Sequence, residues 1–311
     1  MNSKSKFLIG FVFLILSACN DRNTKATATA PQKIAIENGG VKIDYFDSGA
    51  GDTALLFIHG WNINKEYWKD QTAKFSNGYR VVSLDLPGFG QSGKGRETWS
   101  VEEYGKDVTT VLNKLDLKNV VLIGHSMSGA IIIEAALKNP TRVIGVVGVD
   151  NFTNVGAEIS PQLKKEIAEA YKAIRKNYKA VVLQYANESL FSPSTDSTVR
   201  KRVTNDFMNA DSILAVNVLE QNDKYPVDEN LKALKKPLYL INSSYHPTDT
   251  SGFRKYNIPF RLLYVGPTGH YPMIENPDEF NKKLEEVLRA LGKVQITDKR
   301  ALGLLSLEYL V

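Results

Sequence analysis

The chain has 311 residues, of which 43% are apolar and 23% are charged. This composition is ordinary for globular proteins and excludes a disordered or coiled-coil chain. The formal net charge is +5, or +5 − 2 = +3 without residues 1–18, which hold two lysines and no acid. That charge is too small to indicate nucleic-acid binding. A single cysteine excludes an intramolecular disulfide and a thiolate cluster for a metal.

The first residues have the pattern of a secretory signal. Two lysines are followed by an apolar run over residues 7–16, which is too short for a membrane span of about 20 residues. Leu16-Ser17-Ala18-Cys19 resembles the lipobox of bacterial lipoproteins, in which the cysteine becomes the lipidated amino terminus. We expect a signal peptide over residues 1–18, a lipid on Cys19 and an exported lipoprotein anchored to a bacterial membrane. The alternative is a soluble secreted protein with an incidental cysteine.

The chain from residue 19 onward divides into a linker and a folded region. Residues 20–32 are small and polar without an apolar period, so residues 19–32 are predicted to form a flexible tether. Apolar runs bounded by turn residues then predict eight strands. These runs cover residues 33–37, 41–46, 54–58, 79–84, 120–123, 143–149, 238–241 and 260–265.

The spacing of these strands predicts the fold class. Asn38-Gly39-Gly40 between the first two strands is a strong hairpin turn. The later strands alternate with helical stretches at residues 66–75, 101–115, 130–138 and 277–291. Alternation of this kind predicts an α/β fold with a mostly parallel, eight-stranded sheet and helices on both faces. The active site of such a sheet lies at the carboxyl ends of its strands.

One interval breaks the alternation. Apolar residues recur at spacings of three and four over residues 163–185, which predicts one long helix. Further helical stretches follow at residues 196–208 and 211–221. We therefore expect a helical lid over residues 152–235, inserted after the sixth strand, and a core formed by residues 33–151 and 236–292. Residues 293–311 form a tail that ends in an apolar stretch at residues 301–311, and we assign it no role.

The sequence GHSMSG at residues 124–129 lies between the fifth strand and the next helix. A serine at a tight strand-to-helix turn, with glycine on either side, is typical of a nucleophile elbow, which makes Ser126 the candidate nucleophile. The first amides of the helix point at the same place and favour an oxyanion there. Ser128 replaces the second glycine of GxSxG, and we expect this small residue to preserve the turn. Gly-Ser turns before helices also occur without any chemistry.

Three other motifs follow strands in a fixed order. His59-Gly60-Trp61 follows the third strand, residues 85–92 (DLPGFGQS) follow the fourth, and Gly269-His270 follows the eighth. Together with the elbow, these motifs resemble the α/β-hydrolase superfamily over nearly all of residues 33–291. The resemblance implies that fold and an oxyanion hole formed by the backbone amides of Trp61 and Met127. It also implies that residues 85–92 form a structural turn.

A serine nucleophile needs a base with a pKa near neutrality, and histidine is the natural choice. Among the four histidines we favour His270, whose glycine-flanked loop after the last strand fits the serine, acid, histidine order of this fold. Two residues are candidates for the acid that binds this histidine. In most relatives it follows the seventh strand, where the nearest acid is Asp249. The superfamily also places it at the end of the sixth strand, where Asp150 lies, and we favour Asp150.

The resemblance implies a serine hydrolase that cleaves an ester or similar acyl bond of a small, largely apolar substrate, without a cofactor or metal. The serine argues against the epoxide hydrolase and haloalkane dehalogenase branches, which have a carboxylate at the elbow. Thioesterase, lactonase, amidase, carbon–carbon bond hydrolase and cofactor-free haloperoxidase activities stay open. A non-catalytic small-ligand receptor on the same fold is the second class, and a surface protein-interaction lipoprotein is the third.

Overall fold

The computed structural model describes residues 33–308, with side chains as far as residue 292. The predicted signal peptide, Cys19 and the tether lie outside the described residues. Within residues 33–308, no helix combines the length and the apolar character that crossing a bilayer requires.

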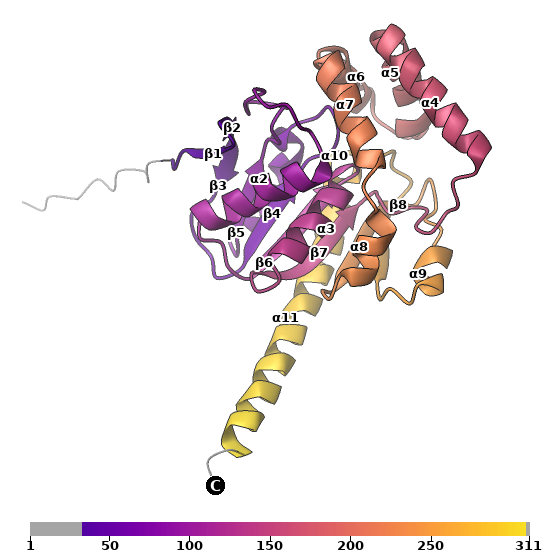
Figure 1. Ribbon diagram of the computed structural model, residues 1–311. Helices are drawn as coiled ribbons and strands as arrows, with labels where there is room; N and C mark the ends of the chain where they lie inside the picture. The colour runs from indigo at the N-terminus through magenta and orange to yellow at the C-terminus, as the bar shows by residue number, and fades with distance from the viewer. Residues whose placement is uncertain (1–32, 309–311) are drawn as a thin grey trace, which may run out of the picture. The chain divides into compact units, whose positions relative to one another are not determined.

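A seven-stranded sheet forms the centre of the fold (Figure 1). Its strands, in spatial order, are β3 (Tyr45–Asp47), β5 (Arg80–Leu84), β4 (Ala54–Ile58), β6 (Val120–His125), β7 (Val143–Val149), β8 (Leu238–Ser243) and β9 (Arg261–Val265). All neighbouring strands are parallel except β3, which is antiparallel to β5. Every residue of β4, β6 and β8 is buried, as expected for strands covered on both faces. The predicted α/β fold is therefore confirmed.

The predicted hairpin forms a sheet of its own. β1 (Ile36–Asn38) and β2 (Val41–Ile43) pair antiparallel around two glycines with positive φ. The run predicted as one strand over residues 41–46 is interrupted at Asp44, and the chain continues as β3 at the edge of the main sheet. The backbone of Asp44 binds to the loop after β5. The Asp44 carbonyl accepts from the Asp85 amide at 2.8 Å, and the Asp44 amide donates to Ser92 Oγ at 2.7 Å. The main sheet thus has seven strands, not eight.

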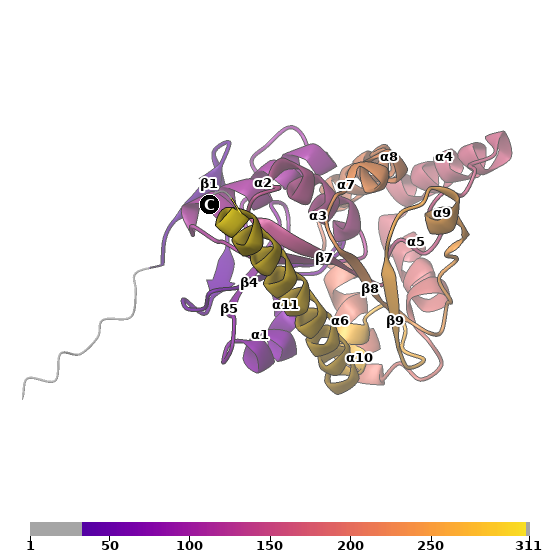
Figure 2. The same ribbon diagram turned by 90° about the horizontal axis from the view of Figure 1, so that it is seen from below.

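Helices cover both faces of the sheet (Figure 2). On one face lie α2 (Val101–Lys114), α3 (Ser128–Lys138) and α8 (Val227–Ala233), with α2 and α8 packed on α3. On the other lie α1 (Lys69–Phe75), which follows the short helix η1 (Lys65–Trp68), and α11 (Pro277–Glu308). Trp68 joins this layer to the sheet, since its ring lies 5.1 Å from the Phe57 ring and 6.2 Å from the Phe280 ring. The helix predicted to end at residue 291 continues to Glu308.

The segment between β7 and β8 contains helices joined by loops, and no strand. It contains α4 (Pro161–Lys176), α5 (Tyr178–Tyr185), the π-helix η2 (Ala186–Leu190), α6 (Ser197–Met208), α7 (Ser212–Asp223) and α8. The single helix predicted over residues 163–185 is broken at Asn177, whose φ of −146° and ψ of 66° lie outside the helical region. We call residues 161–223 the lid, because α8 packs on α3 and so covers the sheet itself. Two short helices, α9 (Ser251–Lys255) and α10 (Pro272–Glu275), follow β8 and β9.

Two hydrogen bonds place the lid over the carboxyl ends of the strands. The indole nitrogen of Trp61, just after β4, donates to the Ala215 carbonyl in α7 at 2.8 Å. The backbone amide of His270, in the loop after β9, donates to the Leu190 carbonyl at 2.8 Å. The lid is therefore attached to two of the loops in which the sequence predicts site residues.

Candidate active site

The turn between β6 and α3 holds Ser126 in an uncommon backbone conformation. Its φ is +52°, in the left-handed region that non-glycine residues seldom adopt. The Ser126 amide donates to the Val149 carbonyl at 2.9 Å, and the Gly129 amide donates to the Ser126 carbonyl at 2.9 Å. Gly124 is required, because a Cβ there would lie 2.6 Å from the Ser128 carbonyl oxygen. This is the geometry of a nucleophile elbow.

Ser128 links the elbow to the loop after β4. Its side chain is fully buried, and its hydroxyl donates to the His59 carbonyl. A Cβ on Gly60 in that loop would lie 2.6 Å from His125 Nδ1 and 3.1 Å from the Ser126 Cβ. Only glycine therefore allows the loop to approach the elbow this closely. The residue that departs from the GxSxG pattern thus adds a contact that the sequence did not predict.

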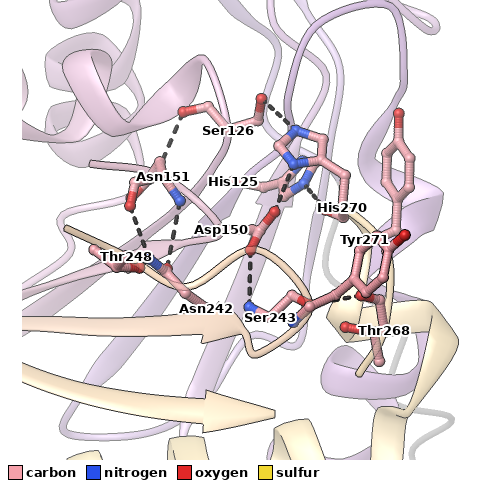
Figure 3. A network of polar contacts seen from close by, with 12 residues as sticks. His125, Ser126, Asp150, Asn151, Asn242, Ser243, Thr248, Thr268, His270 and Tyr271 are labelled. Carbon is pink, nitrogen blue, oxygen red and sulfur yellow. Dashed lines mark hydrogen bonds and ion pairs between the residues drawn. The ribbon is translucent and has the colours of Figure 1, made fainter. Parts of the chain in front are cut away.

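Three side chains from different strand ends meet at this edge of the sheet (Figure 3). His270 Nε2 lies 2.7 Å from Ser126 Oγ, and His270 Nδ1 lies 2.6 Å from Asp150 Oδ2. The second oxygen of Asp150 accepts from the Ser243 amide at 2.8 Å. An ionised carboxylate only accepts hydrogen bonds, so Nδ1 carries the proton and Nε2 accepts from the Ser126 hydroxyl. This series can carry a proton from Oγ to the imidazole.

The surroundings of Asp150 favour its ionised form. Burial alone would raise the pKa of the carboxyl. The hydrogen bonds from His270 and from the Ser243 amide outweigh burial, and the pKa of Asp150 lies below its usual value. Asp150 therefore presents a negative charge to the imidazole.

Asp249 lies apart from this series. It is exposed, and its carboxylate accepts from the Ser251 amide at 2.8 Å and from Ser251 Oγ at 2.9 Å, next to α9. Asp85, in the turn after β5, is buried and accepts from the backbone amides of Lys65 and Gln91. Asp150, and not Asp249, therefore contacts His270. Asp85 stabilises the turn after β5.

Two other histidines are buried near the site. His59 Nε2 accepts from the Leu86 amide at 3.0 Å, and its Nδ1 donates to the Gly60 carbonyl at 2.7 Å. His125 Nε2 donates to the His270 carbonyl at 2.7 Å, and the two rings lie 4.7 Å apart. Burial lowers the pKa of both imidazoles, that of His125 to about 3, so both stay neutral. No pattern in the sequence predicts that His125 supports the His270 loop.

The backbone amides of Trp61 and Met127 belong to the two segments that pack together at Ser126. Among residues 33–308, neither amide has a hydrogen-bond partner within the protein. Close packing of Gly60 on Ser126 brings the Trp61 amide to the elbow, and Met127 directly follows Ser126. Two unpaired amides beside a serine hydroxyl are donors for a developing oxyanion.

Two cavities meet at Ser126. One has a volume of about 160 Å³ and the other of about 580 Å³. Ser126, Met127 and Asn222 line both, whereas His270 and Trp61 line only the small one. Among the described residues, no group of three or more His, Cys, Asp or Glu side chains is arranged to hold a metal ion.

A family model described as "alpha/beta hydrolase fold" matches residues 53–277, which is more than half of the chain. The chain belongs to the α/β-hydrolase fold family. The order of strands and the elbow described above are the features that this family shares.

Relatives within the α/β-hydrolase family differ in their activities. The chain is 27% identical over 282 residues, 85% of this chain and 96% of the relative, to a 2-hydroxy-6-oxononadienedioate/2-hydroxy-6-oxononatrienedioate hydrolase of Burkholderia vietnamiensis. Its fold matches a thermophilic esterase from Thermogutta terrifontis with a TM-score of 0.71 and 22% identity, covering 84% of this chain and 99% of the other. A bromoperoxidase from Bacillus anthracis matches with a TM-score of 0.70 and 21% identity over 80% and 96%.

The hydrogen bonds of Asp150 lead to a prediction about stability. Its carboxyl has a lower pKa in the folded chain than in the unfolded chain, where the value is about 3.9. The ionised form therefore stabilises the fold above that pH, and the contribution is lost as the pH falls through the folded pKa. We expect Asp150→Asn to lower the free energy of unfolding, with a difference from wild type that is constant above about pH 5 and shrinks below about pH 4.

Urea unfolding of wild type and Asp150→Asn at about pH 7, 5 and 3 measures this difference. Asp52→Asn, at an exposed aspartate, is the matched control. A difference that stayed the same down to about pH 3 would contradict the ionised carboxylate.

Proposed function

We propose that this chain is a serine hydrolase that cleaves an ester or similar acyl bond of a small, largely apolar substrate. The observation that carries the proposal is the continuous series from Ser126 Oγ through His270 to Asp150, with contacts of 2.7 and 2.6 Å. Membership of the α/β-hydrolase family supports it.

In the first step, Ser126 Oγ attacks the carbonyl carbon while its proton moves to His270 Nε2. The carboxylate of Asp150 keeps the Nδ1 proton in place and stabilises the imidazolium. The carbonyl oxygen becomes an oxyanion and accepts from the Trp61 and Met127 amides, at the positive end of α3.

In the second step, the bond between the carbonyl carbon and the leaving oxygen breaks. The proton on His270 Nε2 moves to that oxygen, and the alcohol departs, leaving an acyl group on Ser126. A water molecule then gives its proton to Nε2 and attacks the acyl carbon. Collapse of the second oxyanion breaks the bond to Oγ, returns the proton to Ser126 and releases the carboxylic acid.

The charge around the cavities distinguishes this function from the second candidate, hydrolysis of a carbon–carbon bond. The relative from Burkholderia vietnamiensis favours that candidate, and its name specifies a dicarboxylate substrate. The large cavity here is lined by one cation, Lys164, and by two acids, Asp223 and Asp228, while the small cavity has neither a lysine nor an arginine in its wall. This charge disfavours a dicarboxylate and favours a neutral ester.

The first prediction from the proposed function concerns the nucleophile. A fluorophosphonate probe reacts with a serine whose hydroxyl is activated by a base, so it is expected to label wild type and not Ser126→Ala. Labelling is measured on the purified protein by mass spectrometry. Ser212→Ala, at an exposed serine, is the control and is expected to label like wild type. If Ser126→Ala were still labelled, Ser126 would not be the nucleophile.

The second prediction concerns the acid. Asp150→Asn leaves Nδ1 of His270 without its carboxylate, and we expect kcat for a short-chain chromogenic ester to fall by roughly 10² to 10⁴. Asp249→Asn is the matched control and is expected to keep near-normal turnover, because Asp249 only caps the turn before α9. Circular dichroism establishes that both variants are folded. If Asp249→Asn lost turnover and Asp150→Asn kept it, Asp249 would be the acid that binds His270.

We further propose that the chain is exported and anchored to a membrane by a lipid on Cys19, on the strength of the apolar run and the sequence Leu16-Ser17-Ala18-Cys19. Wild type expressed in a bacterium is expected to incorporate labelled palmitate and to sediment with membranes. Cys19→Ser is expected to lose the label. An unlabelled wild type, or a variant that keeps the label, would refute this anchor.

A further inference from the structure

The two cavities at Ser126 have different walls. The small one is enclosed largely by apolar and aromatic side chains, among them Trp61, Tyr185, Leu190, Phe207, Leu219 and Tyr271. The large one is lined by apolar residues that include Met127, Ala130, Phe152 and Val155, with the exposed charges of Lys164 and Asp223 in its wall. The acyl carbon, bonded to Ser126, must lie where the two cavities join.

The position of His270 decides which half of the substrate enters which cavity. Nε2 of this residue has to reach the leaving oxygen, within about 2.6–3.2 Å, in order to protonate it. His270 lines the small cavity and not the large one. The leaving group therefore departs on the side of the small cavity, and the acyl group extends the other way, past Met127 and Ala130.

On this basis we propose that the small cavity binds the alcohol part of the ester and the large cavity binds the acyl part. This assignment rests on the proposed serine-hydrolase function. An apolar cavity of about 150 Å³ holds a benzene molecule, so a cavity of about 160 Å³ has room for an alcohol of about one ring. The substrate class is thus an ester of a small alcohol with a longer apolar acid.

The walls of the small cavity are held in place by the lid. Phe207 in α6 packs edge-on against Trp61, with ring centroids 5.2 Å apart. The Asn62 side chain donates to the Tyr178 hydroxyl in α5 at 2.6 Å, and the Trp61 indole donates to Ala215 in α7. An outward shift of Trp61 or Phe207 would break these buried contacts, so this part of the cavity cannot widen to take a larger alcohol.

Two isomeric esters test the assignment. Methyl decanoate and nonyl acetate contain the same atoms and differ only in which side of the ester carries the longer chain. A nonyl chain is larger than one ring and does not fit the small cavity, so methyl decanoate is expected to have a kcat/KM higher by about tenfold or more. A preference for nonyl acetate, or equal rates, would overturn the assignment.

A pair of variants in α7 tests whether the preference between the two esters arises in the small cavity. Leu219→Ala removes part of its wall, so the ratio of kcat/KM for methyl decanoate over nonyl acetate is expected to fall by about tenfold. Ile213→Ala, on the exposed side of the same helix at 73% exposure, is expected to keep the wild-type ratio. An unchanged ratio in Leu219→Ala would contradict the assignment.

The fluorophosphonate probe separates failure of this inference from failure of the proposed function. If wild type is labelled at Ser126 but hydrolyses neither isomer, the assignment of the two cavities to the alcohol and acyl parts is wrong, and Ser126 is still the nucleophile. Wild type that is neither labelled nor active would overturn both.

Discussion

The structure depends on holding one serine in a backbone conformation that serine does not favour. A non-glycine residue with a φ of +52° adds of the order of 1–3 kcal/mol of strain. The surrounding segments determine this conformation fully: β7 accepts from the Ser126 amide, α3 returns a hydrogen bond to its carbonyl, and Asn151 donates to the Gly124 carbonyl at 2.9 Å. In this conformation the Ser126 hydroxyl lies accessible at the edge of the sheet.

The order of strands in the parallel sheet explains how an acid after β7 reaches the histidine. β7 lies beside β6, which carries the serine, and β8 lies between β7 and β9. The resemblance to the α/β-hydrolase superfamily indicates an acid after the strand that corresponds to β8. Here that strand contributes the Ser243 amide, which donates to one carboxylate oxygen of Asp150. His270 Nδ1 donates to the other oxygen. The acid in this chain follows β7 instead, and its carboxylate meets the imidazole.

Much of the fold follows from the sequence, because strands buried on both faces must be apolar throughout. Ser126 and His270 are also evident from local motifs. The choice between Asp150 and Asp249 is not, since it depends on how a loop crosses the sheet. The break at Asn177 and the roles of His125 and Ser128 escape prediction for a related reason: neither local propensity nor spacing reports contacts between segments far apart in the chain.

The attachment of the lid has a consequence for how this protein can diversify. Trp61 and Asn62 bond to α7 and α5, and the amide of His270 bonds to Leu190. A lid recombined from another family member would have to supply all three partners at once, or the loops around the serine would lose their support. New specificities are therefore more accessible through point substitutions inside the lid than through exchange of the lid as a module.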